Sequence, residues 1–342
     1  MKNKYDSIST IRYMGNKEKL LKYIVPIIEE NIPAGGTICD IMAGTHSVAY
    51  ALKRNYKVIS NDIQYYSYVI GKALMNNYQL PNKNDIKTIL DKYIAENESQ
   101  GNFTFFETNY SDTYFSPEQC VEIDNIRYAI DFFDEDVKFF LLTILMSVMT
   151  KAQSSPGHFA QYMPKDHSRI IPIRKLSIYK LFFEKMDEFN DFVISNYENE
   201  VYNLDYKKLF KNNVLTNVDC IYLDSPYTAD QYSRFYHVLE TVSLYDNPEL
   251  NFKAKYREDR HKSLFSYKRH VRGEFENIIR FSKKNKNKLI ISYSNKGVLE
   301  LDELIKVCNK YFDNVEVKFI DYNHSTQGRG TVERKEVLII LK

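Results

Sequence analysis

The stretch that decides the fold runs from Thr37 to Asp62 and reads TICDIMAGTHSVAYALKRNYKVISND. Residues 37–41 and 57–61 are short apolar runs of the kind that form buried strands, and residues 47–54 between them have helical apolar spacing. A strand, a helix and a second strand in succession predict a βαβ unit. Strands joined in this way lie parallel, in a sheet that helices cover on both faces.

The remainder of the chain extends this pattern and interrupts it once. Strand patterns return at residues 218–223, 288–294, 315–320 and 336–341. The last two flank a polar turn region, which predicts an antiparallel pair that closes the sheet. Between about residue 76 and residue 199 the pattern is helical, with loops and no clear buried strand. We therefore expect an α/β core formed by residues 1–75 and 200–342, with residues 76–199 as an inserted domain.

The composition excludes several classes of protein. The 342 residues carry 47 Lys and Arg against 45 Asp and Glu, and 44% are hydrophobic, which is typical of a globular chain with a buried core. The longest apolar stretch, residues 139–149, is too short to cross a bilayer, and residues 1–10 contain no apolar signal region. The four cysteines are widely scattered and lack the spacing of a zinc site. We expect a soluble cytoplasmic protein without a metal site.

The net charge of +2 conceals a basic segment, residues 253–288. This segment holds 13 Lys and Arg against 4 Asp and Glu, a local charge of +9. Such a segment is either a surface that contacts phosphates or a solvated helix face.

Two motifs follow the first two predicted strands. In Asp40-Ile-Met-Ala-Gly-Thr-His46, the small residues Ala43 and Gly44 let a ligand approach the backbone at a helix N-terminus, although a plain tight turn has the same pattern. The glycine pattern of a dinucleotide fold is absent, which disfavours an NAD enzyme. Asp62, at the end of the second strand, either accepts hydrogen bonds from ribose hydroxyls or caps the following helix.

A third motif, Asp224-Ser225-Pro226-Tyr227, follows the strand at residues 218–223. Open α/β sheets bind ligands at this end of their strands. The Asp224 carboxylate and the Ser225 carbonyl offer two acceptors beside the flat ring of Tyr227, which suits an exocyclic amino group on a planar base. Upstream, Arg12-Tyr-Met-Gly-Asn-Lys17 places a glycine before a lysine-rich helix start, where a simple cap is the competing interpretation.

These segments together resemble a known family. In chain order, RYMGNKEKLL, DIMAGTHSVAYAL, SNDIQYY and IYLDSPY are similar to the Dam-like, or D12 class, S-adenosylmethionine-dependent adenine-N6 DNA methyltransferases. The longer stretch DSPYTADQYSRFYHVLETV is especially similar to the methylases of FokI-type restriction-modification systems. The resemblance implies a class I methyltransferase fold, which is Rossmann-like with a mostly parallel sheet and a C-terminal antiparallel strand. It also implies that the insert is a mainly helical target-recognition domain.

The resemblance assigns residues to two sites. The implied cofactor site consists of Tyr13, Met14, Lys17, Asp40, Met42, Ala43, Gly44, Asp62, Ile63 and Asp205. The implied catalytic motif consists of Asp224, Ser225, Pro226 and Tyr227. Two positions depart from the family pattern, since Ser225 replaces the usual first proline and His46 the usual second glycine of the cofactor loop. The implied cofactor is S-adenosyl-L-methionine, with S-adenosyl-L-homocysteine as the product and no metal.

The implied reaction is methyl transfer to N6 of a flipped-out adenine in double-stranded DNA, in a restriction-modification or orphan methylation system. The sequence alone leaves open the N4 amino group of cytosine, an RNA substrate, and a non-catalytic module that binds DNA or cofactor. The expected partners are DNA and a restriction endonuclease encoded separately, with no membrane contact. We expect a monomer or weak dimer that is prokaryotic or phage-encoded and associated with DNA.

The expected DNA contacts are basic and amide side chains outside the motifs. They are Gln161, Arg169, Arg174 and Lys175 in a polar loop, and Lys268, Arg269 and Arg272 in the basic segment. The loop is equally an interdomain hinge by its composition. The polar turn at residues 324–330 has a similar standing, with a plain surface loop as the alternative.

Overall fold

A computed structural model describes residues 8–78, 80–189, 193–320 and 335–342 of the chain. Its centre is a seven-stranded sheet with the strand order β3-β2-β1-β4-β7-β9-β8. The strands are β1 (Thr37–Asp40), β2 (Lys57–Asn61), β3 (Glu200–Tyr202), β4 (Cys220–Asp224), β7 (Lys288–Ser294), β8 (Val315–Ile320) and β9 (Glu336–Leu341). In this order β1 and β4 are neighbours near the middle of the sheet. The chain adds β2 and β3 on one side of β1 and then β4 and the later strands on its other side, so the order of the strands changes direction between β1 and β4.

The pairing of the strands confirms the predicted α/β class. Strands β3, β2, β1, β4 and β7 are parallel to one another, while β9 is antiparallel to both β7 and β8. The predicted antiparallel pair therefore exists, and its second strand inserts between the first and the rest of the sheet. The edge strand β3 was not predicted, because three half-buried residues give no periodic signal.

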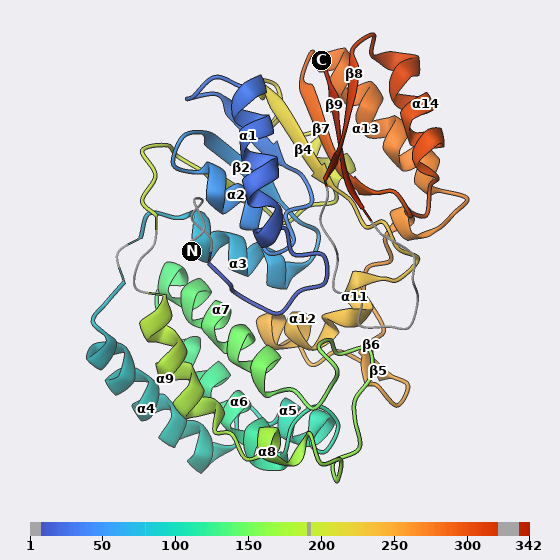
Figure 1. The fold of residues 1–342 in the computed structure, drawn as a ribbon. Coiled ribbons are helices and arrows are strands. Elements are labelled where there is room, and N and C mark those ends of the chain that lie inside the picture. Colours follow the sequence, from blue (N-terminus) through green and yellow to red (C-terminus); the bar gives the residue numbers. More distant parts are fainter. Residues whose placement is uncertain (1–7, 79, 190–192, 321–334) are drawn as a thin grey trace.

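Helices cover both faces of the sheet, as Figure 1 shows. One face packs against α1 (Leu21–Asn31), which follows the short helix η1 (Glu18–Leu20), and α2 (Ser47–Leu52). The other face packs against α10 (Tyr206–Leu209), α13 (Val271–Asn285) and α14 (Leu301–Tyr311). Successive strand residues alternate between these two cores, with Tyr222 and Ile290 on the first and Leu223 and Ile291 on the second.

The segment between β2 and β3 is helical, as expected. After α3 (Tyr65–Met75) come α4 (Lys83–Gln100), α5 (Phe105–Tyr110), α6 (Pro117–Ile130), α7 (Glu135–Ala152), α8 (Ile171–Arg174) and α9 (Ile178–Glu188). The apolar stretch at residues 139–149 lies in α7, where it is almost wholly buried. No helix within the described residues is both long and apolar enough to span a membrane. All four cysteines are buried and free.

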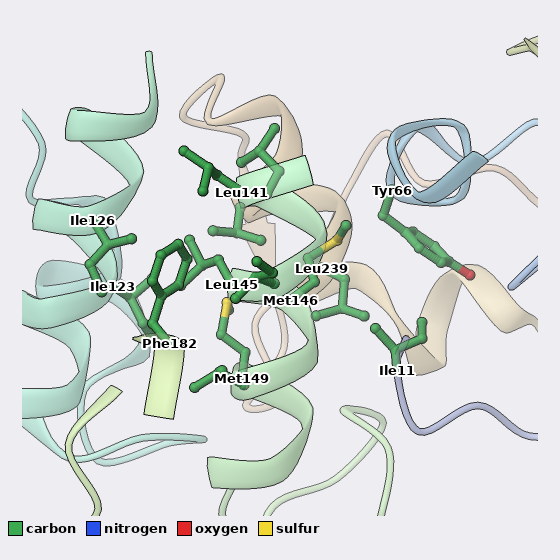
Figure 2. Close-up of a cluster of buried hydrophobic side chains, with 14 of the residues drawn as sticks. Ile11, Tyr66, Ile123, Ile126, Leu141, Leu145, Met146, Met149, Phe182 and Leu239 are labelled. Carbon is green, nitrogen blue, oxygen red and sulfur yellow. The ribbon is translucent and has the colours of Figure 1, made fainter. Parts of the chain in front are cut away.

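The core of these helices is continuous with the rest of the chain. Figure 2 shows Leu145 and Met146 of α7 between Ile123 of α6 and Leu239 of α12 (His237–Leu244), with Tyr66 of α3 beside them. In Figure 1, α3 and α12 lie between the sheet and the other helices of this core. Residues 76–199 therefore share their hydrophobic core with α3 and α12, and their division from residues 1–75 and 200–342 stays a prediction.

Part of the basic segment has a structural role. After α12 the chain forms a small hairpin of β5 (Leu250–Asn251) and β6 (Tyr256–Arg257), followed by η2 (Leu264–Ser266). Arg257 is only 2% exposed, and its guanidinium pairs with Asp246 at 2.7 Å and Asp259 at 2.8 Å. One of the 13 basic residues of the segment is thus committed to the fold, because two carboxylates neutralise it inside the protein.

Candidate active site

A cavity of about 1160 Å³, measured with its opening to solvent, lies at the carboxyl ends of β1, β2 and β4. Its wall includes every residue that the resemblance assigned to the cofactor and catalytic sites: Tyr13, Met14, Lys17, Asp40, Met42, Ala43, Gly44, Asp62, Ile63, Asp205, Asp224, Ser225, Pro226 and Tyr227. None of the seven expected DNA contacts lines it. The fold thus brings two sets of residues from distant parts of the sequence to one hollow.

The loops after β1 and β2 are joined by the carboxylate of Asp62. Its two oxygens accept hydrogen bonds from the backbone amides of Gly44 and Gln64, each at 2.9 Å. Burial raises the pKa of Asp62, and the amide hydrogen bonds from Gln64 and Gly44 offset part of that rise. Both interpretations of this residue therefore have support, since Asp62 lines the cavity and also binds the amide just before α3.

Gly44 occupies a position where a side chain would not fit. Its φ is +55°, and a Cβ atom there would lie 3.3 Å from the ring of Tyr13. Tyr13 in turn stacks on Tyr236 with ring centroids 4.6 Å apart, and the amide of Met14 donates to the Tyr236 hydroxyl at 2.7 Å. The N-terminal motif is thereby held directly over the loop after β1.

His46 explains one departure from the family pattern. Its φ is 59°, a left-handed conformation that glycine adopts without strain and other residues adopt at a cost of about 1 kcal/mol. The side chain is fully buried, points away from the cavity, and lies with Nε2 2.8 Å from the carbonyl oxygen of Ser67. Burial lowers the pKa of His46 to about 4, so the ring is neutral at pH 7. A histidine is accommodated here because α3 has Gly71 opposite, where a Cβ would lie 2.4 Å from the ring.

Two further carboxylates face the cavity. Asp40 is 2% exposed, and its Oδ1 has no hydrogen-bond partner among the described residues. Burial raises the pKa of Asp40 well above its ordinary value, and the negative charges of Asp224 and Asp62 raise it further. Asp205 accepts a hydrogen bond at 2.8 Å from the amide of Lys207, and so caps α10.

The motif that the resemblance assigns to catalysis begins with Asp224, the last residue of β4. Lys17 reaches it from the segment before α1, with Nζ 3.0 Å from Asp224 Oδ1 and 2.9 Å from Glu336 Oε1. Burial raises the pKa of Asp224 to about 7, with Lys17 lowering it and Glu336 raising it. Burial also works to lower the pKa of Lys17, but the two carboxylates raise it well above its ordinary value. Lys17 is therefore a buried cation shared between two acids.

Aromatic rings form the wall next to this motif. The Lys17 ammonium lies 5.2 Å from the ring centre of Tyr227. The hydroxyl groups of Tyr227 and Tyr232 converge on Gly15, where a Cβ atom would lie 3.3 Å and 3.1 Å from them. Ser225 is 1% exposed, and its Oγ has no hydrogen-bond partner among the residues that the structure describes. The arrangement offers a carboxylate beside an aromatic wall, as a planar base with an amino group requires.

Sequence reasoning missed several residues of this site, of which three matter most for its geometry. Tyr232 and Asn16 line the cavity, and Glu336 is the second partner of Lys17. Asn16 links the N-terminal motif to α2, because its Oδ1 accepts a hydrogen bond from Ser47 Oγ at 2.8 Å. Glu336 had a signal in the sequence, since an acid opens the otherwise apolar strand EVLIIL.

The expected DNA contacts differ in their surroundings. Gln161, Arg169 and Lys175 are exposed, whereas Arg174 is half-buried, pairs with Asp112 and donates to the carbonyl of Phe115 at 3.1 Å. In the basic segment, Lys268, Arg269 and Arg272 are exposed, and Arg272 pairs with Glu303 at 3.1 Å. The polar turn at residues 324–330 lies outside the described residues. These assignments stay predictions, and Arg174 has the least freedom to meet DNA because it already holds two partners.

A metal centre is not built into the described part of the chain, where no group of three or more His, Cys, Asp or Glu side chains has suitable geometry. Among the acids around the cavity, Asp224 is paired with Lys17, and Asp62 and Asp205 accept hydrogen bonds from backbone amides.

Comparison with known proteins agrees with this geometry. The family described as D12 class N6 adenine-specific DNA methyltransferase matches residues 13–307. Modification methylase LlaI of Lactococcus lactis subsp. lactis is 32% identical, over 97% of this chain and 55% of its own length. Type II methyltransferase M.FokI of Planomicrobium okeanokoites is 31% identical, over 86% of this chain and 47% of its own length. Type II methyltransferase M.NlaIII of Neisseria lactamica is 26% identical, over 90% of this chain and 91% of its own length.

The chain spans about half the length of LlaI and M.FokI. The family match covers both the N-terminal motif and the Asp224 motif, which meet in the cavity. This chain therefore belongs to the D12 class of N6 adenine-specific DNA methyltransferases, the family that its sequence motifs predicted.

Proposed function

We propose that this chain is a site-specific adenine DNA methyltransferase (EC 2.1.1.72), which transfers a methyl group from S-adenosyl-L-methionine to N6 of a flipped-out adenine in double-stranded DNA. One observation carries the proposal: Asp224 and Tyr227 share a single cavity with the Gly44 and Asp62 junction, in a chain of this family. We propose further that it acts in a restriction-modification system, because its relatives include modification methylases. Such an enzyme works on DNA in the cytoplasm of a prokaryotic or phage-infected cell.

The residues around the cavity fit the proposed cofactor. Asp40 Oδ1 is a buried carboxylate oxygen without a partner among the described residues, which suits the ammonium group of a methionine moiety. The acid Asp62 fits ribose hydroxyls, and Asp205 fits the adenine side of the pocket. Gly44 has no side chain, so a ligand can approach the loop backbone where it lines the cavity. When bound, the cofactor supplies an electrophilic methyl group on a sulfonium.

The role of the catalytic motif follows from the chemistry of adenine. The N6 amino group is a weak nucleophile, because its lone pair is delocalised into the ring. The Asp224 carboxylate and the Ser225 carbonyl would each accept a hydrogen bond from one N6–H, which localises the lone pair for attack. As the N6–carbon bond forms, the methyl–sulfur bond would break, and the surplus N6 proton could pass to the Asp224 carboxylate. The side chain of Tyr227 would stack on the extruded ring and hold it in line. Positioning and fixed charge are sufficient for this step, and no covalent enzyme intermediate is needed.

The DNA surface is proposed to combine the helical insert with the basic segment. The segment borders the cavity, since His261, Ser263 and Leu264 line it while Lys268 and Arg269 remain exposed. Phosphate contacts there would hold the duplex while the insert reads the sequence. On this basis we propose residues 1–75 and 200–342 as the methyltransferase domain and residues 76–199 as the target-recognition domain.

Nucleoside analysis tests the proposal directly. The purified chain is incubated with unmethylated genomic DNA and methyl-deuterated S-adenosylmethionine, and the DNA is digested and separated by liquid chromatography with mass detection. We expect deuterated N6-methyladenine. Deuterated N4-methylcytosine would instead show that the chain methylates cytosine, and no labelled base would favour a non-catalytic module. A parallel incubation with RNA tests the remaining alternative.

A further inference from the structure

The cluster around Lys17 contains an acid that the proposed mechanism does not use. Glu336 is fully buried at the start of β9, and its Oε1 lies 2.9 Å from Lys17 Nζ. Burying a carboxylate is costly unless other groups compensate the charge. Here the compensation comes from Lys17 and from Ser292, whose Oγ donates to Glu336 Oε1 at 2.5 Å.

The sheet explains why these groups meet. Asp224 at the end of β4 is paired in register with Ser292 of β7, and Ser292 with Leu338 of β9. Glu336 is two residues from Leu338, so its side chain lies on the same face of the sheet. Lys17 approaches that face from the segment before α1, which covers it. The position of Glu336 relative to Asp224 is therefore fixed by strand pairing.

The geometry gives Lys17 two competing partners. Its Nζ is 3.0 Å from Asp224 Oδ1 and almost equally far from Glu336 Oε1. A lysine paired with Asp224 alone would occupy the acceptor that an amino group of the substrate needs. The lysine is only 4% exposed, and its departure would leave both carboxylates without their cation.

We propose that Glu336 is a positioning residue for methyl transfer. It binds the Lys17 ammonium and so leaves the Asp224 carboxylate available to the adenine amino group. This inference rests on the proposed function. It assigns to the C-terminal strand a part in catalysis, although Glu336 is not among the residues that line the cavity.

The charges around Asp224 make the inference measurable. The titratable groups that act on it from the surrounding elements are Lys17, Glu336, Asp40, Tyr222 and Tyr232. Among these, Lys17 lowers the pKa of Asp224 and Glu336 raises it. Removing one charge or the other should therefore displace the pKa of Asp224 in opposite directions.

The test compares Glu336→Gln, Lys17→Met and the wild type in kcat/KM for adenine methylation between pH 5.5 and pH 9. For Glu336→Gln we expect the acid limb of the pH profile of kcat/KM to move to lower pH by about one unit. We also expect the plateau of kcat/KM at alkaline pH to fall about tenfold or more. For Lys17→Met we expect the acid limb to move up. Glu316→Gln is the matched control, because Glu316 lies in β8 and pairs with Lys318 and Lys342.

Calorimetry with S-adenosylmethionine and with S-adenosylhomocysteine separates binding from turnover, and Glu336→Gln should leave both dissociation constants within about threefold of the wild type. A lower plateau without a displaced limb would mean that Glu336 only supports the fold, and the inference would be wrong. An unchanged plateau would overturn it as well.

Two controls keep the result interpretable. If Glu336→Gln does not fold by circular dichroism, Glu336→Asp replaces it, because this change keeps the charge but withdraws the carboxylate from Lys17. Because the charge is kept, the limb should stay in place in this variant, and its plateau should fall while both cofactor dissociation constants stay within about threefold of the wild type. An unchanged plateau, or a loss of cofactor affinity together with the plateau, overturns the inference. If the wild type itself methylates no adenine, the proposed function fails and this inference fails with it. An active wild type with superimposable variant profiles refutes the inference alone.

Discussion

Replacing Asp224 by asparagine should abolish methyl transfer and, at alkaline pH, make the folded protein more stable. Asparagine keeps the shape of the side chain and removes its charge. Lys17 retains a partner in this variant, because Glu336 still lies 2.9 Å from its Nζ. The gain in stability follows from the cost of keeping a buried carboxylate charged.

The pKa of Asp224 gives the size and the sign of this effect. Burial raises it to about 7 from an ordinary value of 3.8. Between these values the folded chain holds a proton that the unfolded chain has lost, so folding stability falls as the pH rises toward 7. At 1.36 kcal/mol per unit the full cost is about 4 kcal/mol. Because the side chain keeps 20% exposure, solvent screens the charge and we expect about 2–3 kcal/mol above pH 8.

Urea denaturation of the wild type and Asp224→Asn at pH 5 and pH 8 measures this difference. The variant should be more stable at pH 8, and its advantage should shrink by at least about half at pH 5. Equal stability at pH 8, or a gain that does not depend on pH, would refute the electrostatic reasoning. Calorimetry should still detect S-adenosylmethionine binding to the variant, and retained turnover would remove Asp224 from the catalytic motif.

Three other variants test separate parts of the molecule. Asp62→Ala should weaken S-adenosylmethionine binding by about 10-fold or more, because it removes the acceptor of two backbone amides as well as the proposed ribose contact; an unchanged dissociation constant in calorimetry would exclude this residue from the site. Lys268→Glu combined with Arg269→Glu should weaken binding to all DNA sequences alike and make the affinity less dependent on salt, as measured by fluorescence anisotropy. An affinity equal to that of the wild type at every salt concentration would mean that the segment is only a solvated helix face. Arg257→Ala should lower the free energy of unfolding by about 1–2 kcal/mol, because a buried guanidinium loses its hydrogen bonds to two carboxylates that are 43% and 63% exposed and screened by solvent; a loss of DNA affinity with full stability would show that the residue serves DNA binding instead.

Local sequence patterns predicted most of the sheet. The strands at residues 57–61, 288–294, 315–320 and 336–341 begin and end where their apolar runs do. Strands β2, β7 and β9 are buried and apolar over most of their length, and β8 alternates apolar with polar residues, so each of them has a local signal in the sequence. The short edge strand β3 and the hairpin of β5 and β6 lack that signal, because few of their side chains are buried.

The sequence by itself also determined the family and the two motif sets that meet in the cavity, since the order and content of the motifs identify them. Only the tertiary structure decided how distant groups combine. It inserted β9 between β7 and β8, which carries Glu336 to Lys17 from the other end of the chain. It merged the core of residues 76–199 with α3 and α12, and it turned His46 away from the cavity onto α3. Such contacts depend on strand order and helix packing, which no local pattern of residues encodes.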